Sequence, residues 1–288
     1  MSYTRLRAFH AVAESGSVTG AARRLHLTQP AVTHQVRALE AHHGVELFHR
    51  KGRGLVLTPL GQQLRDLTRH FFDLERQADE LLAAAAGLRG GQLRVGADGP
   101  FHVMRPLRHM SLAFPEVRVT VHMGNSAELQ QRLVDYEVDV AVLAAEPEHD
   151  ALSGVRIGSH RVCLAVGHAH PWASRSTVHL MELEGREMVA REPGSATRRA
   201  FRAALAEVGA EPRFVIELGS REAVREAVAV GLGMAVISEP EVGTDPRVCS
   251  VALVGADVLT HEYVVVRSDR RRVPAIRAFS AAACGDAP

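Results

Sequence analysis

The sequence predicts an N-terminal all-α winged helix-turn-helix, a long linker helix and a C-terminal α/β domain of two lobes. Three observations predict this fold class. Residues 15–40 contain two short amphipathic helical patterns, residues 59–88 carry a long apolar stripe, and segments typical of strands and helices alternate beyond residue 91. The chain has 288 residues, 46% of them hydrophobic, which leaves room for one or two globular domains beside a small helical one.

The helix-turn-helix is predicted over residues 18–37. Ser17 is a suitable N-cap for its first helix and Thr28 for its second, while residues 26 and 27 form the turn. Pro30 stands in the first turn of the second helix, where a missing N–H costs little. The apolar residues at helical spacing, which we expect to face inward, are Val18, Ala21, Ala22, Leu25, Val32, Val36 and Leu39.

The opposite face of the second helix carries the side chains that we expect to contact DNA. Glutamine and arginine make bidentate contacts to base edges in the major groove, and threonine contacts a base edge or a phosphate. The predicted contact residues in this helix are Gln29, Pro30, Thr33, His34 and Arg37. Periodicity alone fits any small amphipathic helix pair just as well, so a second observation has to decide.

A basic hairpin after the second helix is that observation. A short strand around Phe48, a turn over residues 52–54 and a strand over 55–57 predict a two-stranded wing that carries Arg50 and Arg53. Residues 1–60 hold eight Lys and Arg against three acidic residues, a net charge of +5, whereas the whole chain has +1. A basic end on a nearly neutral chain is expected for phosphate contacts. Double-stranded operator DNA is therefore the predicted partner.

The linker helix is predicted over residues 59–90, where apolar residues recur in alternating steps of four and three. This spacing is typical of a coiled-coil seam sustained for about four heptads. The residues of the seam are Leu60, Leu64, Leu67, Phe71, Leu74, Ala78, Leu81 and Ala85. A long helix packed on its own domain would show the same stripe, but a position between two domains favours dimerisation. Gly87, Gly90 and Gly91 are expected to end the helix.

The effector domain is predicted over residues 91–288. Strands are expected at residues 92–96, 117–122, 139–143, 161–166, 188–190, 214–217, 235–237 and 262–266, with helices around 100–113, 126–136, 196–208 and 220–230. Alternation of this kind indicates a mostly parallel sheet with a ligand at the carboxyl ends of the strands. We expect one lobe to comprise 91–161 and 266–288, and the other to be an insertion over 162–265.

Four junctions between strands and helices share a small or capping residue where a helix is expected to begin. One capped helix start is ordinarily only a cap, but four at neighbouring strand ends form a cradle for an anion, because backbone N–H groups and helix dipoles point outward there. The candidate effector-binding residues are Asp98, Gly99, Asn125, Ser126, Ser195, Thr197, Arg198 and Ser220. The serine and threonine hydroxyls would add donors, and Arg198 would add charge.

Other function classes find little support. Cys163, Cys249 and Cys284 are far apart and form no C-x-x-C pair, so a thiol redox sensor is a remote alternative. The histidines lack the spacing of metal ligands, and neither a cofactor nor a metal is expected. The absence of a nucleophile elbow, a P-loop and a dinucleotide fingerprint argues against an enzyme. The N-terminus has no secretory apolar core and no apolar run is long enough for a bilayer, which favours a cytoplasmic protein over a secreted solute receptor.

Residues 2–61 resemble the N-terminal domain of LysR-type transcriptional regulators. The resemblance is carried by LRAFHAVAESGSVTGAARRLHLTQPAVTHQVRALE, GVELFHR and LTPLG. Thr33 and His34 depart from the Ser and Arg that the family often has, which would alter operator preference and leave the fold unchanged. The resemblance implies a homodimer or homotetramer joined through the linker helix, an operator of two half-sites, and RNA polymerase as a further partner.

Residues 92–288 resemble the effector domain of the same family, which shares the two-lobed fold of periplasmic binding proteins. The strings LRVGAD, GNS, DYEVDVAVL, REPGSATRR and GSREAVREAVAVGLGMAVISE are similar to a subgroup associated with aminoethylphosphonate catabolism. This resemblance implies 2-aminoethylphosphonate as the effector, and a different small carboxylate, sulfonate or amino acid is the alternative. Asp98 would then either bind the ligand's ammonium group or serve only as a helix cap.

Overall fold

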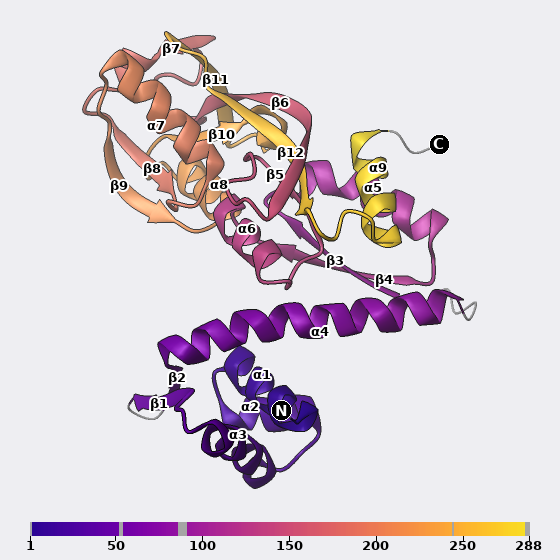
Figure 1. The fold of residues 1–288 in the computed structure, drawn as a ribbon. Helices are drawn as coiled ribbons and strands as arrows, with labels where there is room; N and C mark the ends of the chain where they lie inside the picture. The colour runs from indigo at the N-terminus through magenta and orange to yellow at the C-terminus, as the bar shows by residue number, and fades with distance from the viewer. Residues whose placement is uncertain (1, 52–53, 86–90, 244, 286–288) are drawn as a thin grey trace. The chain divides into compact units, whose positions relative to one another are not determined.

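The computed structural model describes residues 2–51, 54–85, 91–243 and 245–285 (Figure 1). The chain divides into two compact units, residues 1–88 and 89–288, and each is described by itself. No helix in the described part of the chain combines the length and the apolar character that a membrane span requires.

The first unit is a winged helix-turn-helix followed by a long helix. Its elements are α1 (Tyr3–Ser15), α2 (Val18–Leu25), α3 (Gln29–His43), β1 (Phe48–Lys51), β2 (Gly54–Leu57) and α4 (Pro59–Ala85). The two predicted caps are confirmed, since Ser17 Oγ accepts a hydrogen bond from Gly20 N at 3.0 Å and Thr28 Oγ1 accepts one from Ala31 N at 3.4 Å. Each cap satisfies one of the N–H groups that the first turn of a helix leaves free.

The core of this domain uses the predicted stripes. Ala21, Ala22, Val32, Val36 and Leu39 are buried, and Val18 and Leu25 pack against them. Helix α1 supplies further core side chains, which include Ala8, Phe9 and Val12, and Leu47 adds one from the segment before the wing. Two hydrogen bonds join the start of the wing to α3. Glu40 Oε1 accepts them from Leu47 N and Phe48 N at 2.8 and 3.2 Å.

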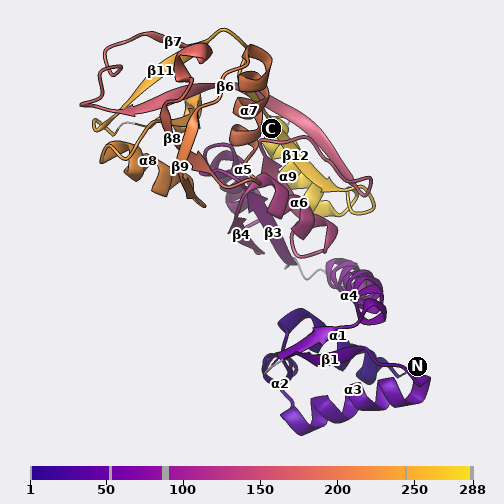
Figure 2. The same cartoon turned by 90° about the vertical axis from the view of Figure 1, so that its left-hand side faces the viewer.

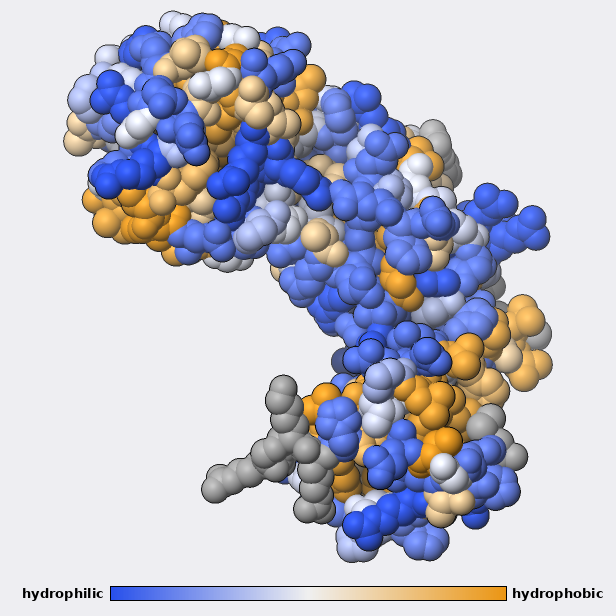
Figure 3. All heavy atoms as spheres, turned by 60° about the vertical axis from the view of Figure 1, so that its left-hand side comes forward, coloured by the Kyte–Doolittle hydropathy of each residue, from blue (hydrophilic) through white to orange (hydrophobic). Residues whose placement is uncertain are grey.

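Helix α4 has two different faces. One packs on the domain, where Leu64 joins the core, His10 and Thr68 share a 3.0 Å hydrogen bond and Arg69 pairs with Glu14 at 2.8 Å. The other bears exposed apolar side chains, and apolar atoms are visible on the surface of this unit in Figure 3. They include Leu60, Leu67, Phe71, Leu74 and Leu81. Leu64 therefore packs on the domain core in the single chain, while residues 86–90, with the predicted stop at Gly87 and Gly90, lie outside the described residues.

The second unit contains an eight-stranded sheet in the order β4-β3-β5-β12-β6-β11-β7, with β10 paired to β6. Its strands are β3 (Gly91–Ala97), β4 (Val117–Met123), β5 (Val140–Leu143), β6 (Leu152–Gly167), β7 (Thr177–His179), β10 (Ala235–Ser238), β11 (Val248–Val254) and β12 (Leu259–Arg267); β8 (Glu187–Arg191) pairs with β9 (Arg213–Leu218). The helices are α5 (Pro100–Ala113), α6 (Ser126–Val134), α7 (Ala196–Val208), α8 (Arg221–Ala229) and α9 (Pro274–Cys284), with short helices η1 (Leu180–Leu183) and η2 (Glu239–Glu241).

The large sheet is mixed, which corrects the expectation of a mostly parallel one. Strand β12 runs antiparallel to both β5 and β6, and β10 and β11 run antiparallel to β6. The cause is the pair of long strands β6 and β12, which join the two lobes in opposite directions. Strands β7 and β11 and helix α9 were not predicted, and α9 packs beside α5 in both views of the ribbon (Figures 1 and 2).

Each lobe has its own hydrophobic core. Strand β12, which returns from the second lobe to the first, enters the first lobe earlier in the sequence than expected. Val162 and Val258 pack in the second lobe's core, whereas Val264 and Val266 pack with Phe279 in the core of the first lobe. We therefore propose that the return crossing lies near residue 260 and not at the expected residue 265.

Candidate functional site

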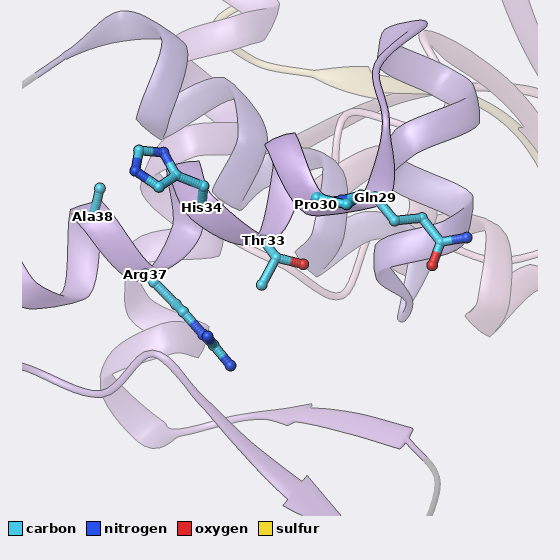
Figure 4. Close-up of a pocket in the computed structure, with 6 residues that line it drawn as sticks. All are labelled: Gln29, Pro30, Thr33, His34, Arg37 and Ala38. Carbon is cyan, nitrogen blue, oxygen red and sulfur yellow. The ribbon is translucent and has the colours of Figure 1, made fainter.

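The exposed face of α3 presents the side chains predicted to contact DNA. Val32, Val36 and Leu39 anchor the inner face, so the residues between them point outward. Figure 4 shows them around one open hollow, whose lining residues are Gln29, Pro30, Thr33, His34, Arg37 and Ala38. Thr33 is half-buried, and the four other predicted residues are exposed. Arg50 lies in β1 opposite Leu55, and Arg53 lies outside the described residues.

Three of the four predicted helix caps of the effector domain are present. Asn125 Oδ1 accepts a hydrogen bond from Glu128 N at 2.9 Å at the start of α6. Ser195 Oγ caps α7 at 3.4 Å and Ser220 Oγ caps α8 at 3.1 Å. Helix α5 differs, because Gly99 occupies its N-cap position and no side chain caps it. Asp98 is therefore not a helix cap.

The beginnings of α6 in the first lobe and α7 in the second meet where the lobes join. Ala127 N donates a hydrogen bond to Gly194 O at 3.4 Å, and Ala144, Ala145 and Ala196 form a small buried cluster. A Cβ at Gly194 would overlap Oδ1 of Asn125, so the loop before α7 requires a glycine there. The structure thus brings together the candidate residues Asn125 and Ser126 of the first lobe and the start of α7 in the second.

The Asp98 carboxylate is buried and already holds hydrogen bonds within its own lobe. Its Oδ2 accepts from Ser126 Oγ at 2.5 Å and from Ala144 N at 2.7 Å. Ser126 is accordingly a partner of Asp98 at the first position of α6, where it is 1% exposed. This leaves Oδ1 of Asp98 as the atom that faces the other lobe.

Arg221, which the sequence reasoning missed, crosses from the second lobe to the first. It stands in the first turn of α8, directly after the Ser220 cap, and donates a hydrogen bond to the backbone carbonyl of Asp98. Its Nη2 lies 3.8 Å from Asp98 Oδ1, and its Nε lies 3.1 Å from Glu241 Oε1. The one available signal was the string GSRE, in which a cation follows a helix cap.

Glu262 is a second residue that was missed. It lies in β12 and is 5% exposed, and a glutamate in the apolar run EYVVV was the signal that could have found it. Burial and the nearby negative charge of Asp98 raise its pKa to about 8, although Arg221 acts in the opposite direction. Burial also raises the pKa of Glu241. The lobe junction thus brings the carboxyl groups of Asp98, Glu241 and Glu262 near the guanidinium group of Arg221, and Arg191 also acts on Glu241.

The other predicted effector residues divide into two groups. Ser195 and Thr197 are buried at the start of α7, and Thr197 lines a small hollow together with Arg191, Arg221 and Glu241. Arg198 instead pairs with Glu217 Oε2 at 2.7 Å and donates to the Arg191 carbonyl. Its charge is therefore already matched by a partner of the second lobe, and the expectation that it supplies free charge to the cradle is not met.

The most buried cysteine gives no structural support to a redox function. Cys163 and Cys249 are free thiols. Cys163 is buried, its Sγ contacts the carbonyl of Ile237 at 3.5 Å, and burial raises the pKa of its thiol to about 11. Because the thiolate is the reactive form, the raised pKa disfavours reaction of this cysteine at neutral pH.

Two family descriptions match nearly the whole chain. Residues 3–62 match the bacterial regulatory helix-turn-helix protein of the lysR family, and residues 86–284 match the LysR substrate binding domain. The RuBisCO operon transcriptional regulator of Allochromatium vinosum is 31% identical over 97% of this chain and 94% of its own length. The HTH-type transcriptional regulator CbbR of Cereibacter sphaeroides is 32% identical over 94% of this chain and 90% of its own.

Solved structures of two further proteins share the fold of this chain. CbnR, a LysR family transcriptional regulator, covers all of both chains with a TM-score of 0.70 and 26% identity, and it has also been solved in complex with its target DNA. A full-length OxyR variant of Pseudomonas aeruginosa shares the fold, with a TM-score of 0.76, 19% identity and coverage of 98% of this chain and 94% of its own. The names of these relatives do not point to aminoethylphosphonate. The chain belongs to the LysR family of bacterial transcriptional regulators, with an N-terminal helix-turn-helix domain and a two-lobed effector-binding domain.

Proposed function

We propose that this LysR-family regulator reads operator DNA with the exposed face of α3 and the wing, and that a small anionic or zwitterionic effector between its two lobes modulates that binding. The observation that carries the proposal is the meeting of the α6 and α7 starts at the lobe junction, with Ser126, Ser195 and Thr197 buried beside them. Free N–H groups and the helix dipole favour a negatively charged ligand at such a place.

The DNA-binding part is supported by exposure and charge. Gln29, His34 and Arg37 are exposed on α3 while its other face is anchored in the core. Arginine at such a position pairs with guanine, and glutamine with adenine. The wing would add sequence-independent phosphate contacts through Arg50 and Arg53.

The effector class is supported by the helix starts, where free backbone N–H groups favour an anion. The regulatory domain of CcmR from Synechocystis PCC6803 has been solved in complex with 2-PG, and it covers 68% of this chain with a TM-score of 0.62. At 22% identity this likeness concerns the fold alone. 2-Aminoethylphosphonate is one candidate that offers an anion to the helix starts, and small carboxylates, sulfonates and amino acids are the others.

The exposed stripe of α4 supports assembly into a dimer, or a tetramer of two dimers, through the linker helix. Phe71, Leu74 and Leu81 are 45%, 49% and 72% exposed in the single chain, and their spacing is that of a coiled-coil seam. Pairing two such helices would remove this apolar surface from water, and a dimer suits two half-sites. The named relatives are regulators, and we propose a regulatory rather than an enzymatic role.

A thermal-shift screen of the full chain against small phosphonates, sulfonates, carboxylates and amino acids tests the effector proposal. We expect at least one compound to raise the midpoint of unfolding and to change the affinity for operator DNA in a gel-shift titration. A set of compounds that stabilise the protein without any change in operator affinity would contradict the regulatory link.

A further inference from the structure

We propose that Glu262 binds a cationic group of the effector, so that the lobe junction selects ligands carrying an ammonium or guanidinium group beside their anion. This inference rests on the proposed effector site and specifies its ligand class. It also moves the cation-binding role from Asp98, where the sequence placed it, to a different carboxylate on a strand that joins the lobes.

The first support is that Asp98 and Glu241 already have close partners. Ser126 Oγ and Ala144 N hold Asp98 Oδ2, and Arg221 Nε lies 3.1 Å from Glu241 Oε1. Glu262 Oε1, in contrast, lies 3.9 Å from His102 Nε2, which is beyond hydrogen-bonding distance. Among the described residues, Glu262 is therefore the carboxyl group of these three that has no hydrogen bond and no ion pair shorter than 3.9 Å.

The second support is an orphaned hydroxyl on the same side of β12. Thr260 is 2% exposed, and its Oγ1 has no hydrogen-bond partner among the described residues. Residues 260 and 262 are two positions apart in the strand, so their side chains lie on the same face of it. A buried hydroxyl without a partner is costly and calls for an explanation, and a ligand N–H donor at this place would satisfy it.

The third support comes from the paired strand β6. His160 stands opposite Thr260 in the register, and its buried Nε2 also has no partner among the described residues. Its ring stacks on His102 at 4.6 Å. Gly158 stands opposite Glu262 and places no side chain beside the carboxyl group. An ammonium group has three donors and no acceptor, which suits a carboxylate, a hydroxyl oxygen and an imidazole nitrogen.

The charged groups around Glu262 also favour a cationic ligand group at this place. The groups that face Glu262 are Asp98, Glu241, Arg221, His102 and His160. Arg221 is shared with the other two acids, and burial lowers the pKa of His102, which keeps that ring neutral. Burial and the negative charges of Asp98 and Glu241 raise the pKa of Glu262 to about 8, which favours the protonated form of its carboxyl group. A bound cation would favour the carboxylate and drive that proton into solvent.

The test is calorimetric titration of the full chain with matched pairs of compounds that differ only in the amine. The pairs are 2-aminoethylphosphonate with ethylphosphonate, β-alanine with propionate, and taurine with ethanesulfonate. We expect a member with an amine to bind about tenfold or more tightly than its partner, because a charge-assisted hydrogen bond is lost in the partner. Repeating the titration at pH 7 in two buffers of different ionisation enthalpy should reveal proton release with the amine compound only.

Two variants sharpen the result. Glu262→Gln keeps the volume and the neutral form of the side chain, and it should abolish both the preference for the amine and the proton release. Glu116→Gln makes the same chemical change at an exposed position and should leave both unchanged.

The outcomes separate this inference from the proposed function. Equal binding of both members of a pair, or a preference that survives in Glu262→Gln, would overturn the role of Glu262 and leave an anion-binding site in place. The proton-release measurement on the natural chain decides even if the variant fails to fold. Stabilisation by none of the compounds in the thermal-shift screen would contradict the proposed effector class itself, and with it this inference.

Discussion

The guanidinium group of Arg221 and the backbone carbonyl of Asp98 form a direct hydrogen bond from one lobe of the effector domain to the other. Arg221 also lies beside Glu241 of its own lobe. It is therefore the cation that holds two carboxyl groups of the lobe junction in place without a ligand. Any ligand that enters between the lobes must compete with this contact or extend it.

Replacing Arg221 should destabilise the effector domain strongly. Arg221→Ala leaves the buried Asp98 and Glu241 without their shared cation, and removing one partner of a buried pair costs about 3 kcal/mol or more. Urea unfolding at pH 7 measures this loss. Arg213→Ala is a suitable control, because Arg213 pairs with Glu187 and both side chains are more than half exposed, so it should cost less than about 1 kcal/mol. Equal losses would mean that the junction is not held by Arg221.

Mutations in α3 should change which DNA sequences are bound, whereas mutations in the wing should weaken binding to all sequences. Thr33→Ala or Arg37→Ala should relax base discrimination at one half-site position and cost about 1–3 kcal/mol on the specific operator. Arg53→Ala should weaken binding to all sequences and reduce the salt dependence, because phosphate contacts act through counterion release. Fluorescence anisotropy with operator and random duplexes at several salt concentrations measures both. If Arg37→Ala lost affinity equally on the two duplexes, Arg37 would be a phosphate contact.

Charges on the exposed stripe of α4 should prevent assembly. Phe71→Asp together with Leu74→Asp would place like charges in a buried seam, which is strongly unfavourable. Sedimentation velocity should then show a smaller species with poor operator affinity. Gln62→Asp together with Gln63→Asp adds the same charge to exposed positions of the same helix and should not change the assembly. An unaltered oligomer in the first double variant would place the interface elsewhere.

Removal of hydroxyls at the start of α7 should weaken anion binding without unfolding the lobe. Thr197→Ala and Ser195→Ala should each reduce the affinity for the best ligand of the screen by about tenfold, the equivalent of one charge-assisted hydrogen bond. Ser195 also caps α7 through Arg198 N, so its variant should lose about 1 kcal/mol of stability as well. Calorimetry and thermal unfolding of both variants separate the two effects. Unchanged affinity in Thr197→Ala would remove that hydroxyl from the site.

The stability of the domain should depend on pH through Glu262. The pKa of its carboxyl group rises from the ordinary 4.5 to about 8 in the folded chain, so the folded state holds a proton that the unfolded state has released. This contribution to stability is complete below about pH 4.5 and is lost as the pH rises toward about 8. In urea unfolding, Glu262→Gln should therefore lose less stability than the natural chain between these values. If the free energy of unfolding changed equally with pH in the two proteins, the carboxyl group of Glu262 would be ionised over this whole pH range.

The sequence by itself determined the helix-turn-helix, the wing, five helix caps and most strands and helices of the effector domain. These features are local. Ser17, Thr28, Ser195 and Ser220 cap the helices that follow them because a side-chain oxygen reaches an N–H only three residues away. The apolar period of α3 likewise decides within a few turns which face packs in the core and which face stays exposed.

Only the tertiary structure decided which residues meet at the lobe junction. Asp98 reads locally as a cap, but folding turns its carboxylate toward Ser126 and Ala144 N. Arg221 contacts Asp98 although the two residues are 123 positions apart in the sequence. Glu262 is buried near Asp98 although 164 positions separate them. The antiparallel return of β12 beside β6 is equally non-local. Pairings of this kind depend on how two lobes close on each other, and no spacing within a short segment encodes that geometry.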